Sequence, residues 1–115
     1  MKVLGVNATA RASLYLYNDE ADVDALYKAI EHRIIDCLVS VHAPVTNERK
    51  DVEFDHAPFG GSTLEIALSA SLEALYHKRD FSISRVIELG STRPAQLLRM
   101  ADRKGTLKPG ADADL

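Results

Sequence analysis

The stretch IIDCLVSVHAPVT, residues 34–46, decides the fold. Its first seven residues, 34–40, are almost continuously apolar. This pattern is typical of a strand buried on both faces, as parallel strands are in α/β proteins. From residue 42 to residue 61 the sequence is mostly polar, with two prolines and two glycines. Because so long a connection inside a compact domain is usually functional or disordered, we predict a buried strand that runs into such a loop.

Helical patterns flank this strand and loop on both sides. Upstream, alternation over 12–17 predicts a strand, and an Asn-Asp-Glu start followed by apolar residues at helical spacing predicts a helix over 18–33. Downstream, a leucine at every turn predicts a helix over 64–75. A shorter helix is expected from Phe81 to a glycine cap at Gly90, and a third one follows it. The order of elements predicts an α/β chain.

The last residues, 105–115, predict a strand that enters a turn at Pro109-Gly110. The sequence stops at Leu115, where the strand after that turn has just begun. We therefore expect an incomplete fold with marginal or loose packing, dominated by the helices.

Composition excludes several classes of protein. The 115 residues carry a formal net charge of -3, with Lys and Arg spread among Asp and Glu, so no basic surface for nucleic acid or an anionic membrane is expected. No apolar run approaches the ~20 residues of a membrane span. Cys37 is the only cysteine, which excludes an internal disulfide and favours a cytoplasmic location. We expect its thiol to be buried and inert.

Six segments, in order, resemble the C-terminal part of dihydroorotases. The family's last barrel strand runs into Asp-His-Ala-Pro-His-Thr, and later segments read Ala-Pro-Phe-Gly, Gly-Leu-Glu and Ser-x-Asn-Pro-Ala. The matching segments here are 35–46 (IDCLVSVHAPVT), 48–50 (ERK), 54–60 (FDHAPFG), 64–65 (LE), 91–95 (STRPA) and 102–115.

This resemblance implies a fragment of a TIM-barrel metal-dependent hydrolase. Residues 34–101 would form the last strand and the helices after it, and residues 102–115 the start of the returning small β-domain. Residues 1–33 would form a strand-helix unit before them. The family uses one or two zinc ions to interconvert dihydroorotate and carbamoyl aspartate in pyrimidine biosynthesis.

The residues that the resemblance assigns to catalysis are missing. Val41 stands at the family's catalytic Asp position, and Val45 stands where a His binds the substrate carboxylate. Phe59 and Gly60 match a loop whose backbone contacts the substrate. The His-x-His metal ligands would lie upstream of this sequence, so no metal site and no cofactor are expected. His42 is interpreted as a loop histidine without a metal role, and His56 as solvated.

The first third resembles another family as well. Residues 5–18 and 23–26 look like the C-terminal segment of pyridoxal-phosphate cysteine desulfurases, in which the arginine matching Arg11 binds a carboxylate. A chimera with a junction between residues 22 and 34 would follow. A competing alignment keeps VNATAR, residues 6–11, as a diverged dihydroorotase Val-Asn-Pro-Pro-Leu-Arg, with Asn7 as a remnant of substrate binding.

Three functions remain open from the sequence. The first is a dihydroorotase-like fragment that is inactive on its own. The second is a non-catalytic partner of aspartate transcarbamoylase, a role that dihydroorotase-like chains without metal residues can take; self-association is a related expectation, because an unpaired barrel strand exposes its edges. The third is a desulfurase-related fragment. A small-molecule substrate is not expected in any of them.

Overall fold

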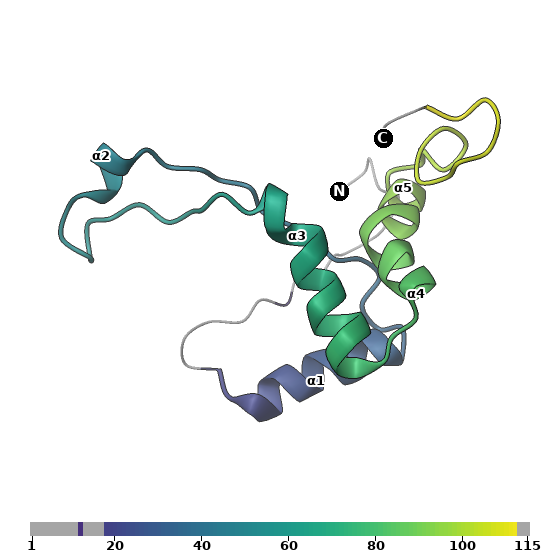
Figure 1. Ribbon diagram of the computed structural model, residues 1–115, viewed down its shortest axis with the longest axis horizontal. Helices are drawn as coiled ribbons and strands as arrows, with labels where there is room; N and C mark the ends of the chain where they lie inside the picture. Colours follow the sequence, from purple (N-terminus) through teal and green to yellow (C-terminus); the bar gives the residue numbers. More distant parts are fainter. Residues whose placement is uncertain (1–11, 13–17, 113–115) are drawn as a thin grey trace. The chain divides into compact units, whose positions relative to one another are not determined.

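The computed structural model describes residue 12 and residues 18–112 (Figure 1). The predicted strand over 12–17 and the site candidates Asn7 and Arg11 lie outside the described residues. The chain divides into two compact units, the first made of Met1–Leu38 with Ile87–Leu115 and the second of Val39–Val86. No helix in the described part of the chain is long and apolar enough to cross a lipid bilayer.

Helix α1, Glu20–Glu31, opens the described part of the first unit. It begins where the sequence predicts, because Asp19 accepts a hydrogen bond from the backbone N–H of Asp22 (3.1 Å) and the Asp22 side chain accepts one from the Asp19 N–H (3.3 Å). This reciprocal capping box satisfies two donors at the helix start. Ile30 near the helix end is buried, with 2% of its surface exposed.

The first unit also contains most of a continuous helical stretch. Helix α4 (Ile83–Ile87), which begins in the second unit, leads into the π-helical turn η2 (Glu88–Thr92) and then into α5 (Arg93–Leu97). The prediction of a helix end at Gly90 is therefore wrong. Gly90 does not have the positive φ of a glycine cap, and the helix widens to a π-turn there instead of stopping.

Ion pairs and close contacts hold the first unit together. The Glu88 carboxylate accepts from Arg33 after α1 (2.9 Å) and from Arg93 in α5 (3.2 Å). Gly105 lies so near Ala95 that an added Cβ would come 2.9 Å from the alanine methyl. The predicted Pro109-Gly110 turn is present: Gly110 has φ +89°, and the N–H of residue 111 donates to the carbonyl of residue 108 (3.0 Å). A glycine with positive φ after a proline is what a type II turn requires.

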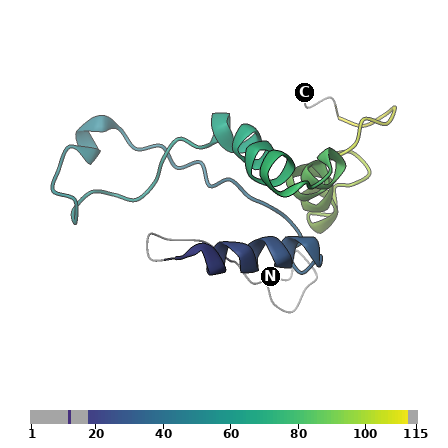
Figure 2. The same ribbon diagram turned by 60° about the horizontal axis from the view of Figure 1, so that its bottom comes forward.

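The second unit consists mainly of a long loop and the helix that follows it. Helix α3 (Leu64–Ser71) continues through the π-helical turn η1 (Leu72–His77), which confirms the helix predicted from the leucine spacing. Before it, residues 39–63 form an excursion that leaves the start of α3 and returns to it, with the single-turn helix α2 (Asn47–Lys50) inside it (Figures 1 and 2). Leu75 and Val86 are the buried apolar side chains of this unit.

The predicted strand over 34–40 needs correction. These residues run without regular secondary structure, and no strand occurs anywhere in the part of the chain that the structure describes, including 105–112. Ile34 and Val39 are 73% and 76% exposed, so the stretch is not buried on both faces. The physical reason is that a strand needs a neighbouring strand to pair with. Here the N–H groups of Ile34 and Ile35 donate to the Ala29 carbonyl in α1, and that of Leu38 donates to the Leu89 carbonyl at 3.0 Å. Cys37, expected to be buried, is half-buried.

Candidate functional site

Two short segments, residues 40–43 and 61–64, meet where the long loop begins and ends; we call them the loop base. The Ala43 N–H donates to the Gly61 carbonyl (3.1 Å), and the Thr63 hydroxyl donates to the Val41 carbonyl (3.0 Å). The hydroxyls of Ser40 and Thr63 are 2.8 Å apart. These bonds join residues about twenty positions apart in sequence and so fix where the loop starts and stops.

His42 makes the most specific contact of the loop base. Its Nδ1 accepts hydrogen bonds from the backbone N–H groups of Thr63 (3.2 Å) and Leu64 (3.1 Å). These are donors at the start of α3, which have no partner inside the helix. No side-chain bond from Thr63 itself caps the helix. His42 therefore caps α3 from a segment more than twenty residues earlier.

A glycine shapes the end of the loop. Gly60 has φ +128°, a conformation that L-residues rarely adopt, and a Cβ added to it would overlap the Ala43 carbonyl oxygen. The Gly60 carbonyl also accepts from the Lys50 ammonium at the end of α2. The close approach of the two backbones depends on residue 60 having no side chain.

The predicted site residues inside the described part surround this base without forming a catalytic group. Val41 is 69% exposed and Phe59 is 88% exposed, while Val45 is half-buried. Neither valine can ligate a metal or carry a proton. The remnant loop residues Phe59 and Gly60 directly precede the second segment of the loop base, and no acid, base or metal ligand stands at position 41.

One cluster that sequence reasoning missed has metal-ligand chemistry. Among the described residues, Glu53, Asp55 and His56 place one ligand atom each within 4.8 Å of one another, and all three are exposed. His56 Nδ1 lies 3.3 Å from the Glu53 carboxylate and 3.6 Å from that of Asp55. The His56 position was interpreted as solvated, and its exposure agrees with that. A cluster formed within four residues of an exposed loop is a weak indication of a site.

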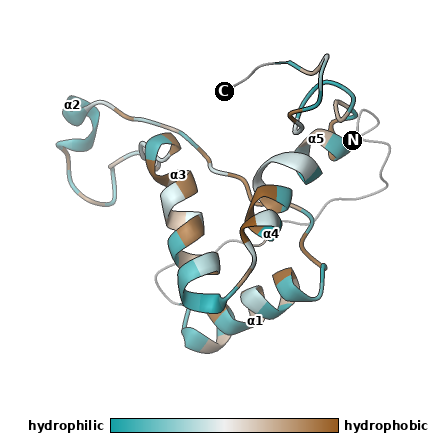
Figure 3. Ribbon diagram, turned by 45° about the vertical axis from the view of Figure 1, so that its right-hand side comes forward, coloured by the Kyte–Doolittle hydropathy of each residue, from teal (hydrophilic) through white to brown (hydrophobic). Residues whose placement is uncertain are grey.

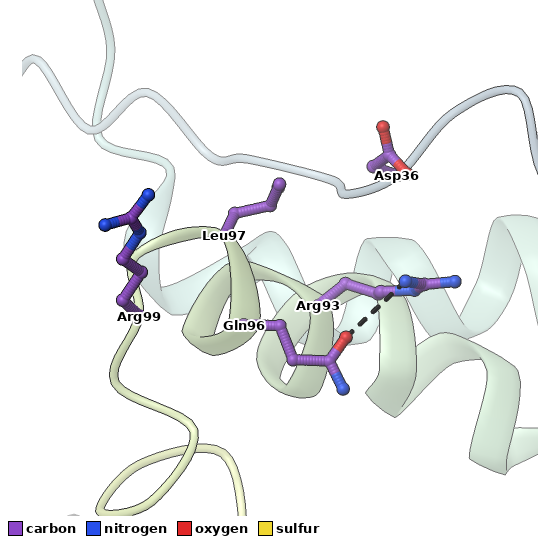
Figure 4. A pocket seen from close by; sticks show the side chains of 5 residues that line it. All are labelled: Asp36, Arg93, Gln96, Leu97 and Arg99. Carbon is purple, nitrogen blue, oxygen red and sulfur yellow. Dashed lines mark hydrogen bonds between the residues drawn. The ribbon is translucent and has the colours of Figure 1, made fainter. Parts of the chain in front are cut away.

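A shallow pocket in the first unit is lined mostly by polar side chains from two places in the sequence (Figure 4). Its volume is about 180 Å³, and its lining is Asp36, Arg93, Gln96, Leu97 and Arg99. Arg93 is already engaged by the Glu88 carboxylate and, more weakly, by the Gln96 amide oxygen (3.5 Å). The lining contains two cations, Arg93 and Arg99, and the charge of Arg93 is already paired with Glu88. The pocket is therefore a poor anion site.

Among the described residues, two of the three carboxyl groups with a lowered pKa, Asp22 and Asp112, owe the shift to hydrogen bonds with neighbouring residues. A hydrogen bond from Lys104 lowers the pKa of Asp112, with a further contribution from Arg103. A hydrogen bond from the Asn18 amide, with one from the Asp19 N–H, lowers the pKa of Asp22 in the capping box. Both groups are stabilised as carboxylates at chain turns and helix ends, which makes them structural rather than catalytic acids.

Residues 6–115 match the Amidohydrolase family, by the description of the family model. The chain belongs to the amidohydrolase family. Its curated relatives include the dihydroorotase of Elusimicrobium minutum, 40% identical over 96 residues, which are 84% of this chain and 22% of that protein. The dihydroorotase of Endomicrobium trichonymphae is 36% identical over 113 residues, 98% of this chain and 26% of that protein.

A putative dihydroorotase of Rhodopirellula baltica is 40% identical over 93 residues, 81% of this amidohydrolase chain and 20% of that protein. The chain thus spans about a fifth to a quarter of the length of these curated relatives. The dihydroorotase resemblance inferred from the ordered motifs is confirmed. Family membership implies a portion of a TIM-barrel hydrolase, although the α/β detail of that prediction is not observed in the described residues.

Proposed function

We propose that this chain is a dihydroorotase-like segment of an amidohydrolase that does not by itself catalyse the zinc-dependent interconversion of dihydroorotate and carbamoyl aspartate. The observation that carries the proposal is Val41, an exposed aliphatic side chain at the position of the family's catalytic Asp. Ring opening requires a metal-activated hydroxide and a carboxylate that carries its proton to the leaving nitrogen. Val41 can do neither.

The histidines of the sequence support the same proposal. They stand at positions 32, 42, 56 and 77, so no two of them have the His-x-His spacing of a metal pair. The Nδ1 of His42 is already used as an acceptor for the two N–H groups at the start of α3. The donors that these residues offer do not match a buried catalytic zinc site, which keeps three protein ligands around an open position.

Zinc content and a designed substitution test the proposal together. We expect well below one zinc ion per chain after dialysis, and no gain of dihydroorotate turnover in Val41→Asp. Val39→Asp is the matched control, since it adds the same charge at a similarly exposed position two residues earlier. Stoichiometric zinc together with turnover by the unmodified chain would contradict the proposal, whereas turnover that appears only in Val41→Asp would show that the remaining catalytic groups are present.

A binding role is the second candidate, and exposed apolar surface favours it. Helix α3 carries Leu64, Ile66 and Leu68 with 67%, 57% and 65% of their surfaces exposed, and Figure 3 shows hydrophobic positions along the helix. A helix that is apolar on more than one side is normally covered by protein. The cover we propose is another polypeptide, either a second copy or aspartate transcarbamoylase. Sedimentation of the chain alone and with the transcarbamoylase distinguishes the two; a monomer in both experiments would remove this role.

The origin and location of the chain complete the proposal. The single match over 6–115 supports the alternative in which Asn7 belongs to a diverged dihydroorotase. The desulfurase-derived chimera remains a proposal, and cysteine binding that disappears in Arg11→Ala would support it. We place the protein in the cytoplasm, on the strength of its single half-buried cysteine.

A further inference from the structure

We infer that His42 is a pH-dependent cap on α3, which accepts from the N–H groups at the start of the helix only while its imidazole is neutral. The inference goes beyond the proposed function, because it concerns neither zinc nor the substrate. It starts from two hydrogen bonds: His42 Nδ1 accepts from the N–H groups of Thr63 (3.2 Å) and Leu64 (3.1 Å).

The direction of these bonds fixes the protonation state of the ring. Backbone N–H groups only donate, so Nδ1 must present its lone pair and the proton of the neutral imidazole must sit on Nε2. An imidazolium carries N–H groups on both nitrogens. Its Nδ1–H would then face two other donors, and both bonds to the α3 start would be lost. An imidazole changes charge between about pH 5 and pH 8.

The second histidine of the loop is arranged in the opposite way. His56 Nδ1 lies 3.3 Å from the Glu53 carboxylate and 3.6 Å from the Asp55 carboxylate, both of which only accept. Protonation therefore strengthens the contacts of His56 while it breaks those of His42. His56 therefore serves as an internal control. It lies in the same loop, and acid strengthens its contacts whereas acid breaks those of His42.

Two charged groups belong to the segments that adjoin the loop base. Glu65 lies in the first turn of α3, and the ammonium of Lys50 donates to the Gly60 carbonyl. The positive end of α3 opposes a cation at this place. The two hydrogen bonds that Nδ1 accepts are the contacts that protonation of the ring abolishes, so they decide whether α3 keeps its cap.

The expected change is local. The bonds from Ala43 to Gly61 (3.1 Å) and from the Thr63 hydroxyl to the Val41 carbonyl (3.0 Å) contain no titrating group and persist in acid. What is lost is the cap on the first N–H groups of α3. On the scale of a lost N-cap, amide-exchange protection at Thr63 and Leu64, taken relative to the intrinsic rate at each pH, falls roughly fivefold to thirtyfold.

Nitrogen NMR of the imidazoles in the whole chain tests the inference without any substitution. While His42 is neutral we expect its proton on Nε2 and a bare Nδ1. On acidification, the loss of protection at Thr63 and Leu64 should follow the protonation of His42 and not that of His56. A neutral His42 with its proton on Nδ1, or protection that does not change with pH, would overturn the inference.

Two substitutions separate the cap from the titration. In His42→Asn the amide oxygen takes the place of Nδ1 and cannot be protonated, so protection at Thr63 and Leu64 should be kept and become independent of pH. His42→Gln places its oxygen farther out and should lose protection at every pH. His56→Asn, the matched control, should leave the pH response intact. Equal behaviour of the Asn and Gln variants at His42 would contradict the inference.

Discussion

Replacement of Gly60 by alanine tests how the loop base is built. The backbone at Gly60 has φ +128°, and a Cβ there would overlap the carbonyl oxygen of Ala43. A side chain in so sparsely populated a region costs about 1–3 kcal/mol before any overlap is counted. The neighbouring Gly61 is the matched control, because its φ is not positive and a Cβ added to it meets nothing within 4 Å.

The effect of Gly60→Ala should appear in the hydrogen bond that closes the loop. The Ala43 N–H donates to the Gly61 carbonyl at 3.1 Å, so its amide exchange reports directly on closure. A cost of about 1–3 kcal/mol corresponds to a loss of protection of roughly 5- to 150-fold. For Gly61→Ala we expect no loss, and a gain of up to about 1 kcal/mol from the less flexible unfolded chain. Equal protection at Ala43 in the two variants would refute the reasoning.

Further predictions concern the first unit and the exposed cluster. Leu89→Ala should destabilise the stretch from α4 to α5 by about 2–5 kcal/mol, measured by amide exchange, because Leu89 is 0% exposed; Leu98→Ala, at a 58% exposed position, should change it by less than about 0.5 kcal/mol. The hydrogen bond from Lys104 lowers the pKa of Asp112, so the stabilisation is present above about pH 4 and is lost as the pH falls through the lowered pKa of the folded state. In Asp112→Asn, exchange of the amides in this turn should not show that dependence; an unchanged acid response would contradict it. Removal of metal with a chelator should leave the circular dichroism unchanged, because the 53–56 cluster is exposed and supports no packed residues; a loss of helical signal would be evidence of a structural metal.

Local chemistry explains which elements could be predicted from the sequence. The start of α1 was predictable because Asp19 and Asp22 supply the complete capping box themselves. The turn at Pro109-Gly110 was predictable for the same reason, since the two residues fix the backbone angles without help from elsewhere. Gly90 misled the prediction because a glycine marks a helix end only when it takes a positive φ, and the π-turn η2 leaves it without one.

Contacts between distant residues explain what could not be predicted. An apolar run such as 34–40 becomes a strand only when another strand pairs with it, and no strand occurs in the described residues. The role of His42 as a cap was missed because Thr63 and Leu64 lie more than twenty residues away, and no local pattern marks the contact. The absence of a carboxylate at position 41, by contrast, could be predicted from the sequence alone. The structure adds only that the Val41 side chain is exposed.

Turnover of dihydroorotate by the purified 115-residue chain, with zinc in excess, tests most directly whether the chain is inactive on its own. We expect no conversion above the uncatalysed rate in either direction, because Val41 supplies neither a proton carrier nor a metal ligand. Zinc-dependent conversion by the unmodified chain, removed by a chelator and restored by zinc, would contradict it.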